Sequence, residues 1–361
     1  MKDFFNKMDK KFLYTSGLLI SIPLLIIIVL MMLRGCQGKK MTYEKYQDKM
    51  LIKAKKYFEY HKLLPTNDGK VAVVTLDDLI SYGLKSPKRS LKDSSCTGSV
   101  TVRNNNSEYQ YIPYLDCKDY KTDYVINHLK KDIVTSESGL YQVGNEYIYK
   151  GNKVNNYISF FNTLYRIIKI DSNNNLRLVK VKREDAQVSW DDKYNVSVDE
   201  NVGINDYYNS SIYDTLWKSY NNIKSVTKDM KTHMLSHDVC LDKKSLNDKS
   251  IEQPVCQNVL KNQYISIPSV YDYTNASYDE NCKSIGDGAC ANFNYLDDVL
   301  YATWTVNASS DDTFSVYYLS GHYVDVQKAE NYKSYYWIIN ISGNEIYQGG
   351  EGTLEKPYII K

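Results

Sequence analysis

The sequence predicts an α+β protein with an N-terminal transmembrane helix, a small helix-plus-antiparallel-sheet domain and a larger β-rich domain. Three patterns lead to this prediction. An uncharged apolar run lies near the start of the chain, an amphipathic helical pattern follows it, and short alternating strands separated by turns fill most of the rest. The chain has 361 residues, enough for two folded domains at roughly 100–200 residues per domain.

The apolar run extends from Phe12 to Leu33 without a formal charge. A helix of this length spans about 33 Å, which exceeds the hydrocarbon core of a bilayer at about 30 Å. The run is longer than the core of a signal peptide, and no small-residue cleavage site follows it. We therefore predict a cytoplasmic tail over residues 1–11, an uncleaved transmembrane helix over residues 12–34, and attachment to the cell membrane through Phe12–Leu33.

A lipoprotein signal is an alternative interpretation of the same region. Leu33-Arg34-Gly35-Cys36 resembles a bacterial lipobox, in which the cysteine is lipidated and becomes the mature N-terminus. Arg34 departs from this pattern, because that position normally holds a small or apolar residue. Cys36 is thus an alternative lipidation site. Both interpretations place the bulk of the chain on the same side of the membrane.

The other six cysteines form three sequence-local pairs, Cys96/Cys117, Cys240/Cys256 and Cys282/Cys290. An even number of cysteines beyond a membrane anchor favours disulfide bonds, which persist in an oxidising, extracytoplasmic compartment. Pairing of nearest neighbours is the simplest connectivity, because each bond closes a short loop. Structural zinc is the competing explanation, but the cysteine spacings fit no zinc pattern. The pairs therefore predict disulfides and a single-pass protein with an extracellular C-terminal ectodomain.

Residues 41–122 are predicted to form the membrane-proximal domain. Apolar residues recur at steps of three and four between Tyr43 and Tyr60, which predicts an amphipathic helix. The expected elements after it are a strand at Lys70–Thr75, a brief helix from Asp77 to Gly83, and two hairpin strands at Ser99–Arg103 and Tyr109–Leu115. A bond between Cys96 and Cys117 would close the open end of the hairpin.

The order of these elements resembles the head of a type IV pilin or pseudopilin. Pilins carry a leader that ends in Gly and an acidic residue just inside the apolar segment, and this chain has no charge between Phe12 and Leu33. The resemblance implies an alternative function as a structural subunit of a pilus-like or secretion apparatus.

Residues 123–138 are expected to be a linker, and residues 139–361 a second domain rich in short strands. The predicted strands are Glu146–Lys150, Tyr157–Phe161, Leu164–Ile170, Leu176–Val181, Tyr264–Pro268, Ala302–Val306, Ser315–Leu319, Tyr335–Ile341 and Pro357–Ile360. Short helices are expected over residues 204–220 and 225–237. Short strands with a few helices between them favour an α+β fold over a β-sandwich.

Several motifs in this second domain resemble a known group of proteins. The segment from Phe161 to Ile170, FNTLYRIIKI, matches an F-x-x-x-L-W/Y-R-I-I-x-I opening. Further matches are Ser189-Trp190, Trp304-Thr305, Gly350-Glu351-Gly352-Thr353 and Pro357-Tyr358-Ile359-Ile360. With these motifs, residues 139–361 resemble uncharacterised surface domains of low-GC Gram-positive bacteria and their phages. Several of those domains are similar to the C-type-lectin-like fold of formylglycine-generating enzymes, so the resemblance implies a C-type-lectin-like domain.

Catalytic and metal-binding patterns are weak throughout the sequence. His233 and His237 are four residues apart, a spacing that places both imidazoles on one face of a helix, and Cys240 could be a third zinc ligand. The glutamate of a zinc protease is missing, and no Gly-x-Ser-x-Gly motif is present. Acidic stretches such as Asp191-Asp192 fit no EF-hand loop. We therefore predict no enzyme, no cofactor and no metal site.

Charge and aromatic content point to the class of partner. The net charge is +2, from 45 Lys+Arg and 43 Asp+Glu, and this near balance argues against nucleic acid as a binding partner. Tyrosine is abundant, with 35 residues against 8 Phe, and aromatic residues cluster among polar ones late in the chain. Such faces suit sugar or protein ligands. The candidate ligand-binding residues are Trp304, Tyr317, Tyr323, Tyr335 and Trp337, although alternating strands would also place some of them in the core.

The function expected from the sequence is that of a membrane-anchored bacterial cell-surface protein. Its distal domain is predicted to be a non-catalytic ligand-binding or adhesion module. The expected ligand is a glycan, a cell-wall component or a host protein.

Overall fold

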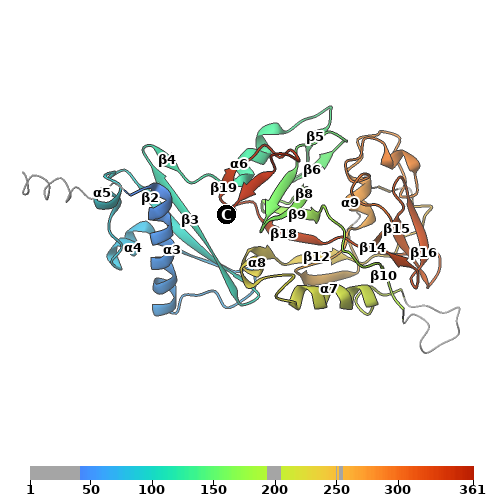
Figure 1. The fold of residues 1–361 in the computed structure, drawn as a ribbon, viewed down its shortest axis with the longest axis horizontal. Coiled ribbons are helices and arrows are strands. Elements are labelled where there is room, and N and C mark those ends of the chain that lie inside the picture. The colour runs from blue at the N-terminus through green and yellow to red at the C-terminus, as the bar shows by residue number, and fades with distance from the viewer. Residues whose placement is uncertain (1–40, 193–204, 249, 252–254) are drawn as a thin grey trace, which may run out of the picture.

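The computed structural model describes residues 41–192, 205–248, 250–251 and 255–361. This part of the chain is mixed α+β and mostly β, with a small helix-and-sheet unit beside a larger unit that contains a curled nine-stranded sheet (Figure 1). The predicted tail over 1–11, the predicted transmembrane helix over 12–34 and Cys36 lie outside the described residues. Within the described ranges, no helix has both the length and the apolar character needed to cross a membrane.

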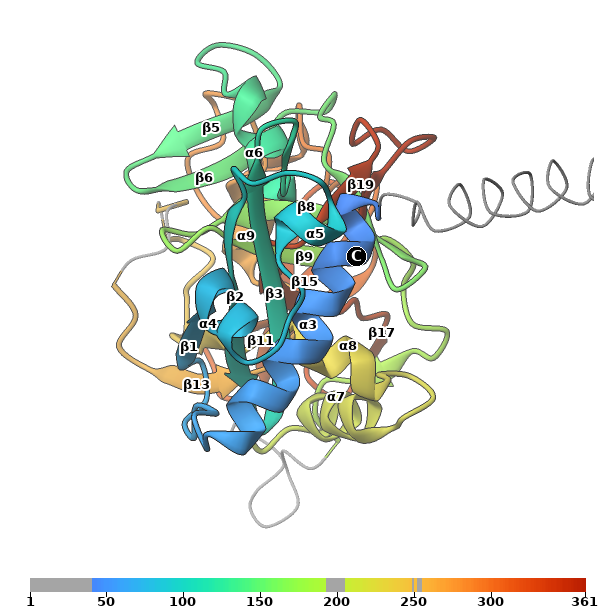
Figure 2. The same ribbon diagram turned by 90° about the vertical axis from the view of Figure 1, so that its left-hand side faces the viewer.

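The small unit packs a long helix against a four-stranded antiparallel sheet (Figure 2). Its elements are α3 (Tyr43–Tyr60), β1 (Val71–Thr75), α4 (Leu76–Ser81), α5 (Pro87–Ser90), β2 (Thr97–Asn105), β3 (Glu108–Cys117) and β4 (Tyr120–Lys121). The strands lie in the order β1-β2-β3-β4. The apolar periodicity predicted the bounds of α3, and the Thr42 side chain caps the helix by accepting a hydrogen bond from the Lys45 amide.

A single stripe of α3 holds the small unit together. Tyr46, Met50, Ala54 and Phe58 follow one another at steps of four and are at most 1% exposed. They form one core with strand residues such as Val100. The β2–β3 hairpin is longer than predicted, because only Asn106 and Ser107 form its turn and both adopt positive φ angles, of 52° and 67°.

The larger unit contains the nine-stranded sheet, in which only the β20–β7 pair is parallel. Its strands are β5 (Gly139–Val143), β6 (Glu146–Lys150), β7 (Tyr157–Phe160), β8 (Thr163–Ile170), β9 (Asn175–Lys180), β11 (Met234–Leu235), β18 (Ile338–Ser342), β19 (Tyr347–Gly349) and β20 (Tyr358–Ile360). The main strand order is β11-β18-β9-β8-β7-β20-β19, and β6 joins β5 to β8.

Smaller sheets and short helices surround this sheet. Two of these sheets have two strands each: β10 (Val188–Ser189) pairs with β17 (Tyr332–Lys333), and β12 (His237–Cys240) pairs with β13 (Val259–Gln263). A third sheet has three strands, β14 (Thr303–Ala308), β15 (Ser315–Leu319) and β16 (Val324–Lys328). The helices are α6 (Val125–Leu129), η1 (Lys130–Asp132), α7 (Ser211–Asn221), α8 (Lys228–His233), α9 (Val270–Thr274) and η2 (Gly288–Ala291).

Three of the sequence-based expectations about these elements are corrected by the structure in ways that matter for the site. The helix expected over 225–237 ends at His233, because the next two residues pair with β18 as β11. The strand expected at Tyr264–Pro268 is instead a buried segment with one bridge, between Ser266 and Ile338. The linker expected over residues 123–138 instead contains α6. Its side chains Val125, Ile126 and Leu129 belong to the core of the larger unit.

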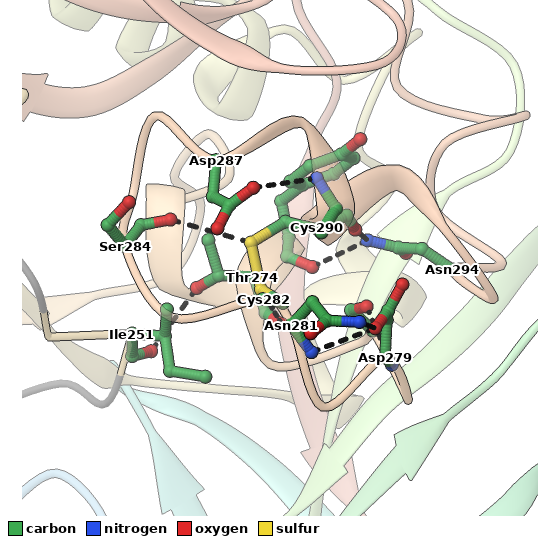
Figure 3. The surroundings of a disulfide bond; sticks show 12 residues. Ile251, Thr274, Asp279, Asn281, Cys282, Ser284, Asp287, Cys290 and Asn294 are labelled. Atoms are coloured by element: carbon green, nitrogen blue, oxygen red, sulfur yellow. Dashed lines mark hydrogen bonds between the residues drawn. A yellow bond between two sulfur atoms is a disulfide. The ribbon is translucent and has the colours of Figure 1, made fainter.

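The three predicted disulfides are confirmed, as Cys96–Cys117, Cys240–Cys256 and Cys282–Cys290. Figure 3 shows the third bond inside a loop that is also held by hydrogen bonds. The Asn294 side chain donates to the carbonyls of Cys290 and Tyr273, at 2.7 and 2.8 Å. This loop is therefore fixed by covalent and polar contacts together.

A buried arginine joins three segments of the larger unit. Arg166 of β8 is 6% exposed, and it donates hydrogen bonds to Asn156 Oδ1, to the Tyr157 hydroxyl, and to the carbonyls of Val154 and Tyr295. Its guanidinium carbon also lies 4.2 and 4.5 Å from the ring centroids of Tyr157 and Tyr295. These neutral oxygens and aromatic faces compensate for the loss of water around the buried cation.

The two units meet through polar side chains. The buried Glu345 carboxylate accepts a hydrogen bond from Gln110 Nε2 at 2.6 Å and lies 2.9 Å from His233 Nδ1. Nearby, Asp68 accepts hydrogen bonds from the Tyr264 hydroxyl at 2.6 Å and from Ser236 Oγ at 2.9 Å. Both carboxylates thus contact partners from the other unit, so they connect two separate hydrophobic cores.

We predict that the Glu345–His233 contact makes the stability of the protein depend on pH. Burial alone would lower the pKa of His233, but the neighbouring Glu345 carboxylate outweighs burial and raises this pKa above its ordinary 6.5. The stabilisation is therefore full below about pH 6.5 and is lost as pH rises through the raised pKa of the folded state. Glu345→Gln should lower the free energy of unfolding by about 1–3 kcal/mol at pH 6, and by less at pH 9.

Urea unfolding at both pH values checks this prediction. Glu351→Gln is the matched control, because its ion pair with Lys356 is exposed on both sides and such pairs contribute little stability. An equal loss for Glu345→Gln at pH 6 and pH 9 would contradict the assigned role of His233.

Candidate functional site

The predicted aromatic binding residues are mostly in the core. Trp304 and Tyr317 are fully buried, Trp337 is 4% exposed and Tyr335 is 5% exposed, whereas Tyr323 is 46% exposed. The prediction of an exposed aromatic face is therefore wrong for four of these five residues. Tyr323 lies in the turn between β15 and β16.

Packing on both sides of β14 and β15 explains this outcome. Every residue of β14 and of β15 is buried, so the alternation that would expose every second side chain does not apply. The polar atoms of the rings have internal partners as well. Trp304 Nε1 donates to the Val188 carbonyl at 2.9 Å, and the Tyr317 hydroxyl donates to the Lys244 carbonyl at 3.0 Å.

Exposed aromatic rings instead line a groove between α7 and β13, with a volume of about 400 Å³. We call it the α7–β13 groove. Its lining residues are Tyr208, Tyr213, Leu216, Trp217, Tyr220, Leu260, Lys261, Asn262, Gln263, Tyr264 and Ile265. Trp217 is 50% exposed and Tyr208 is 54% exposed, so both rings are available to a ligand.

The sequence of α7 explains why these rings project outward. Ser210 caps the helix by accepting a hydrogen bond from the Tyr213 amide. Ile212, Leu216 and Tyr220 then form the buried stripe at steps of four. Trp217 follows Leu216 directly and is therefore turned about 100° away from that stripe, toward solvent.

The aromatic rings of the groove support one another. Tyr220 is stacked between Trp217 and Tyr264, with ring centroids 5.8 and 5.5 Å away. Tyr208 lies 5.1 Å from Tyr213 by ring centroids. Since Tyr220 and Tyr264 belong to the core, the exposed rings are held on a rigid wall.

Polar groups accompany the rings, and none of the lining residues is acidic. The Tyr213 hydroxyl donates to Gln263 Oε1 at 3.0 Å. The ammonium group of Lys231 lies 4.3 Å from the centre of the Tyr220 ring, and Lys261 and Asn262 are exposed at the rim. Flat apolar faces beside amide and ammonium donors can stack on a sugar ring and hydrogen-bond its hydroxyl groups.

The zinc arrangement considered for His233, His237 and Cys240 is not formed. His233 ends α8 and contacts Glu345, whereas His237 lies in β12, and Cys240 is bonded to Cys256. Burial, with a smaller contribution from Arg177, lowers the pKa of His237 to about 3, so this imidazole is neutral. The groups of three potential ligands found among the described residues each include both sulfurs of a disulfide, which are not thiolate ligands.

No family model, curated protein or solved structure matches this chain. The resemblance of residues 139–361 to C-type-lectin-like surface domains therefore stays a prediction. The α7–β13 groove was missed at the sequence level, although an exposed Trp beside the apolar stripe of a short helix is a signal that could have identified it. The other wall of the groove, β13, is remote from α7 in sequence, and no sequence pattern indicated that the two elements lie together.

We predict stability losses of different size for alanine substitutions of two tryptophans. Trp304→Ala should lower the free energy of unfolding by about 3–5 kcal/mol, because it removes a fully buried ring. Trp217→Ala should lower it by less than about 1.5 kcal/mol, because half of that ring is already in water. Urea unfolding followed by far-ultraviolet circular dichroism measures both values without relying on tryptophan fluorescence. Similar losses for the two variants would contradict the assignment of Trp217 to a surface groove.

Proposed function

We propose that this protein is a membrane-anchored, non-catalytic cell-surface protein that binds a glycan in the α7–β13 groove. The observation that carries the proposal is the pair of half-exposed rings, Trp217 and Tyr208, beside Gln263 and Lys261. The rings are held in place before any ligand arrives, so little conformational entropy is lost on binding. The three disulfides support an extracytoplasmic location.

The charge of the groove narrows the class of glycan. Its lining residues include Lys261 but no carboxylate, and the Lys231 ammonium lies over Tyr220. A neutral or acidic polysaccharide therefore meets no repulsion there, whereas a cationic polymer gains no ion pair. Cell-wall polysaccharides of either kind are the proposed ligands, and the C-type-lectin-like resemblance of residues 139–361 is consistent with this role.

Binding of the full chain to glycans tests the proposal. The protein is kept in a detergent without a sugar headgroup and is applied to immobilised bacterial cell-wall polysaccharides. Trp217→Ala should weaken binding at least about tenfold, because a half-exposed ring that lines the groove is lost. Tyr332→Ala is the matched control, since this ring is 66% exposed and lies outside the groove. Equal binding by the two variants and the wild type would overturn the assignment of the groove.

A structural subunit of a pilus-like assembly is the second candidate function, and one observation favours it. Among the described residues, β1 is an edge strand whose one pairing partner is β2, and its Val71 and Val73 side chains are 51% and 59% exposed. An apolar strand with an open edge can add a strand from another molecule.

Crosslinking in the native membrane tests this alternative. If the chain assembles through β1, crosslinked multimers should form with the wild type and should be lost with Val73→Lys, because a lysine at an edge opposes strand addition. Ile359→Lys is the control, since that side chain is 46% exposed on the larger unit. Finding only monomers for the wild type would exclude the alternative.

A further inference from the structure

A row of polar side chains crosses the nine-stranded sheet. In the register of the strands, Lys169 of β8 lies opposite Arg177 of β9, and Arg177 lies opposite Asn340 of β18. All three are only partly buried, while their neighbours along the strands are fully buried. One face of the sheet therefore faces the core, and the other carries this polar row.

The polar row forms the floor of a groove. A cavity of about 490 Å³ is lined by all three residues of the row, by His237 and Asp238 of β12, and by Asp272 of α9. A second cavity of about 410 Å³ shares Lys169, Tyr271 and Asp272 with it. We call this continuous depression the sheet groove. Its combined size suits a ligand of one or two sugar rings.

Each charged side chain that lines the sheet groove has an internal partner. Asp171 accepts hydrogen bonds from the backbone amides of Asn173 and Asn175, and Asp238 accepts one from the Asn262 amide. Arg177 donates two hydrogen bonds to Asp272, from Nε at 2.9 Å and from Nη2 at 2.8 Å. Lys169 pairs with Glu146 in the adjoining cavity, and His237 is neutral, as described above. A charged ligand would have to compete with these internal partners, so the groove favours an uncharged one.

One polar atom in the floor lacks a partner. The side-chain oxygen of Asn340 is buried and accepts no hydrogen bond from the described residues. A buried amide oxygen without a donor lowers stability unless a ligand or water satisfies it. The amide groups of Asn173, Asn175 and Asn307 also line the groove. Donors and acceptors therefore converge on it from several side chains.

We infer that the sheet groove is a second binding site, for an uncharged, hydroxyl-rich ligand of the saccharide class. A sugar hydroxyl group both donates and accepts hydrogen bonds, so it can supply the donor that Asn340 lacks while it accepts from neighbouring amides. The site is distinct from the α7–β13 groove: β12 lines one and β13 lines the other, and these two strands pair with each other. The inference goes beyond the proposed function, because it does not require Trp217 or Tyr208.

Saturation-transfer NMR of the full chain tests the inference, again in a detergent without a sugar headgroup. The probes are methyl β-glucoside, methyl β-galactoside, methyl α-mannoside and N-acetylglucosamine, with methyl β-glucuronoside as the charged comparison. At least one neutral probe should bind, and the glucuronoside should bind no more tightly. Asn340→Ala should weaken that binding at least about tenfold, since the acceptor in the floor is removed. Asn344→Ala, at an exposed position just after β18, is the matched control.

The stability of Asn340→Ala is measured alongside its binding. Its unfolding midpoint should equal or exceed that of the wild type, because the substitution removes a buried atom that has no partner. A loss of binding without a loss of stability therefore supports a ligand contact. A lower midpoint would show that Asn340 has a structural role and would overturn the inference.

The same experiment separates this inference from the proposed function. Trp217→Ala should leave binding of the neutral probe unchanged. If Trp217→Ala abolishes probe binding and Asn340→Ala does not, the sheet groove is overturned and the α7–β13 groove stands. If no neutral probe binds the wild type, the inference is overturned, whatever the polysaccharides do at the α7–β13 groove.

Discussion

The larger unit depends on one buried cation. Arg166 has been removed from water in the middle of β8, and its guanidinium is satisfied by two carbonyls, an amide oxygen and a phenol. These acceptors come from Val154 and Asn156 just before β7, from Tyr157 at the start of β7, and from Tyr295, far along the chain. A buried cation that lost any of these partners would be costly, so the three segments must come together as the protein folds.

The arginine also links the sheet to the disulfide loop. Tyr295 follows the Cys282–Cys290 bond, packs against the Arg166 guanidinium and donates from its amide to the Gly151 carbonyl at 2.9 Å. The loop next to α9 is thereby fixed against the sheet. Because α9 carries Asp272, which neutralises Arg177, the same constraint helps to hold the wall of the sheet groove.

Local elements of this fold could be predicted from the sequence, and long-range surfaces could not. Helix α3 follows from its apolar periodicity, and the disulfides follow from cysteine spacing. Whether Trp304 or Tyr317 is exposed depends on what covers each face of β14 and β15, which no local pattern records. The polar row similarly needs the register of β8, β9 and β18, and Asn340 is remote from Arg177 in sequence.

Each of the three disulfides joins cysteines that are close in the chain, at separations of 21, 16 and 8 residues. Among the described residues, no disulfide bond joins the small unit to the larger one. If the chain is exported as proposed above, each bond can close as soon as its own short loop has crossed the membrane, before the next pair of cysteines emerges. Oxidation in chain order would give the native pairing directly, so this protein should depend little on an isomerase to correct wrong pairs.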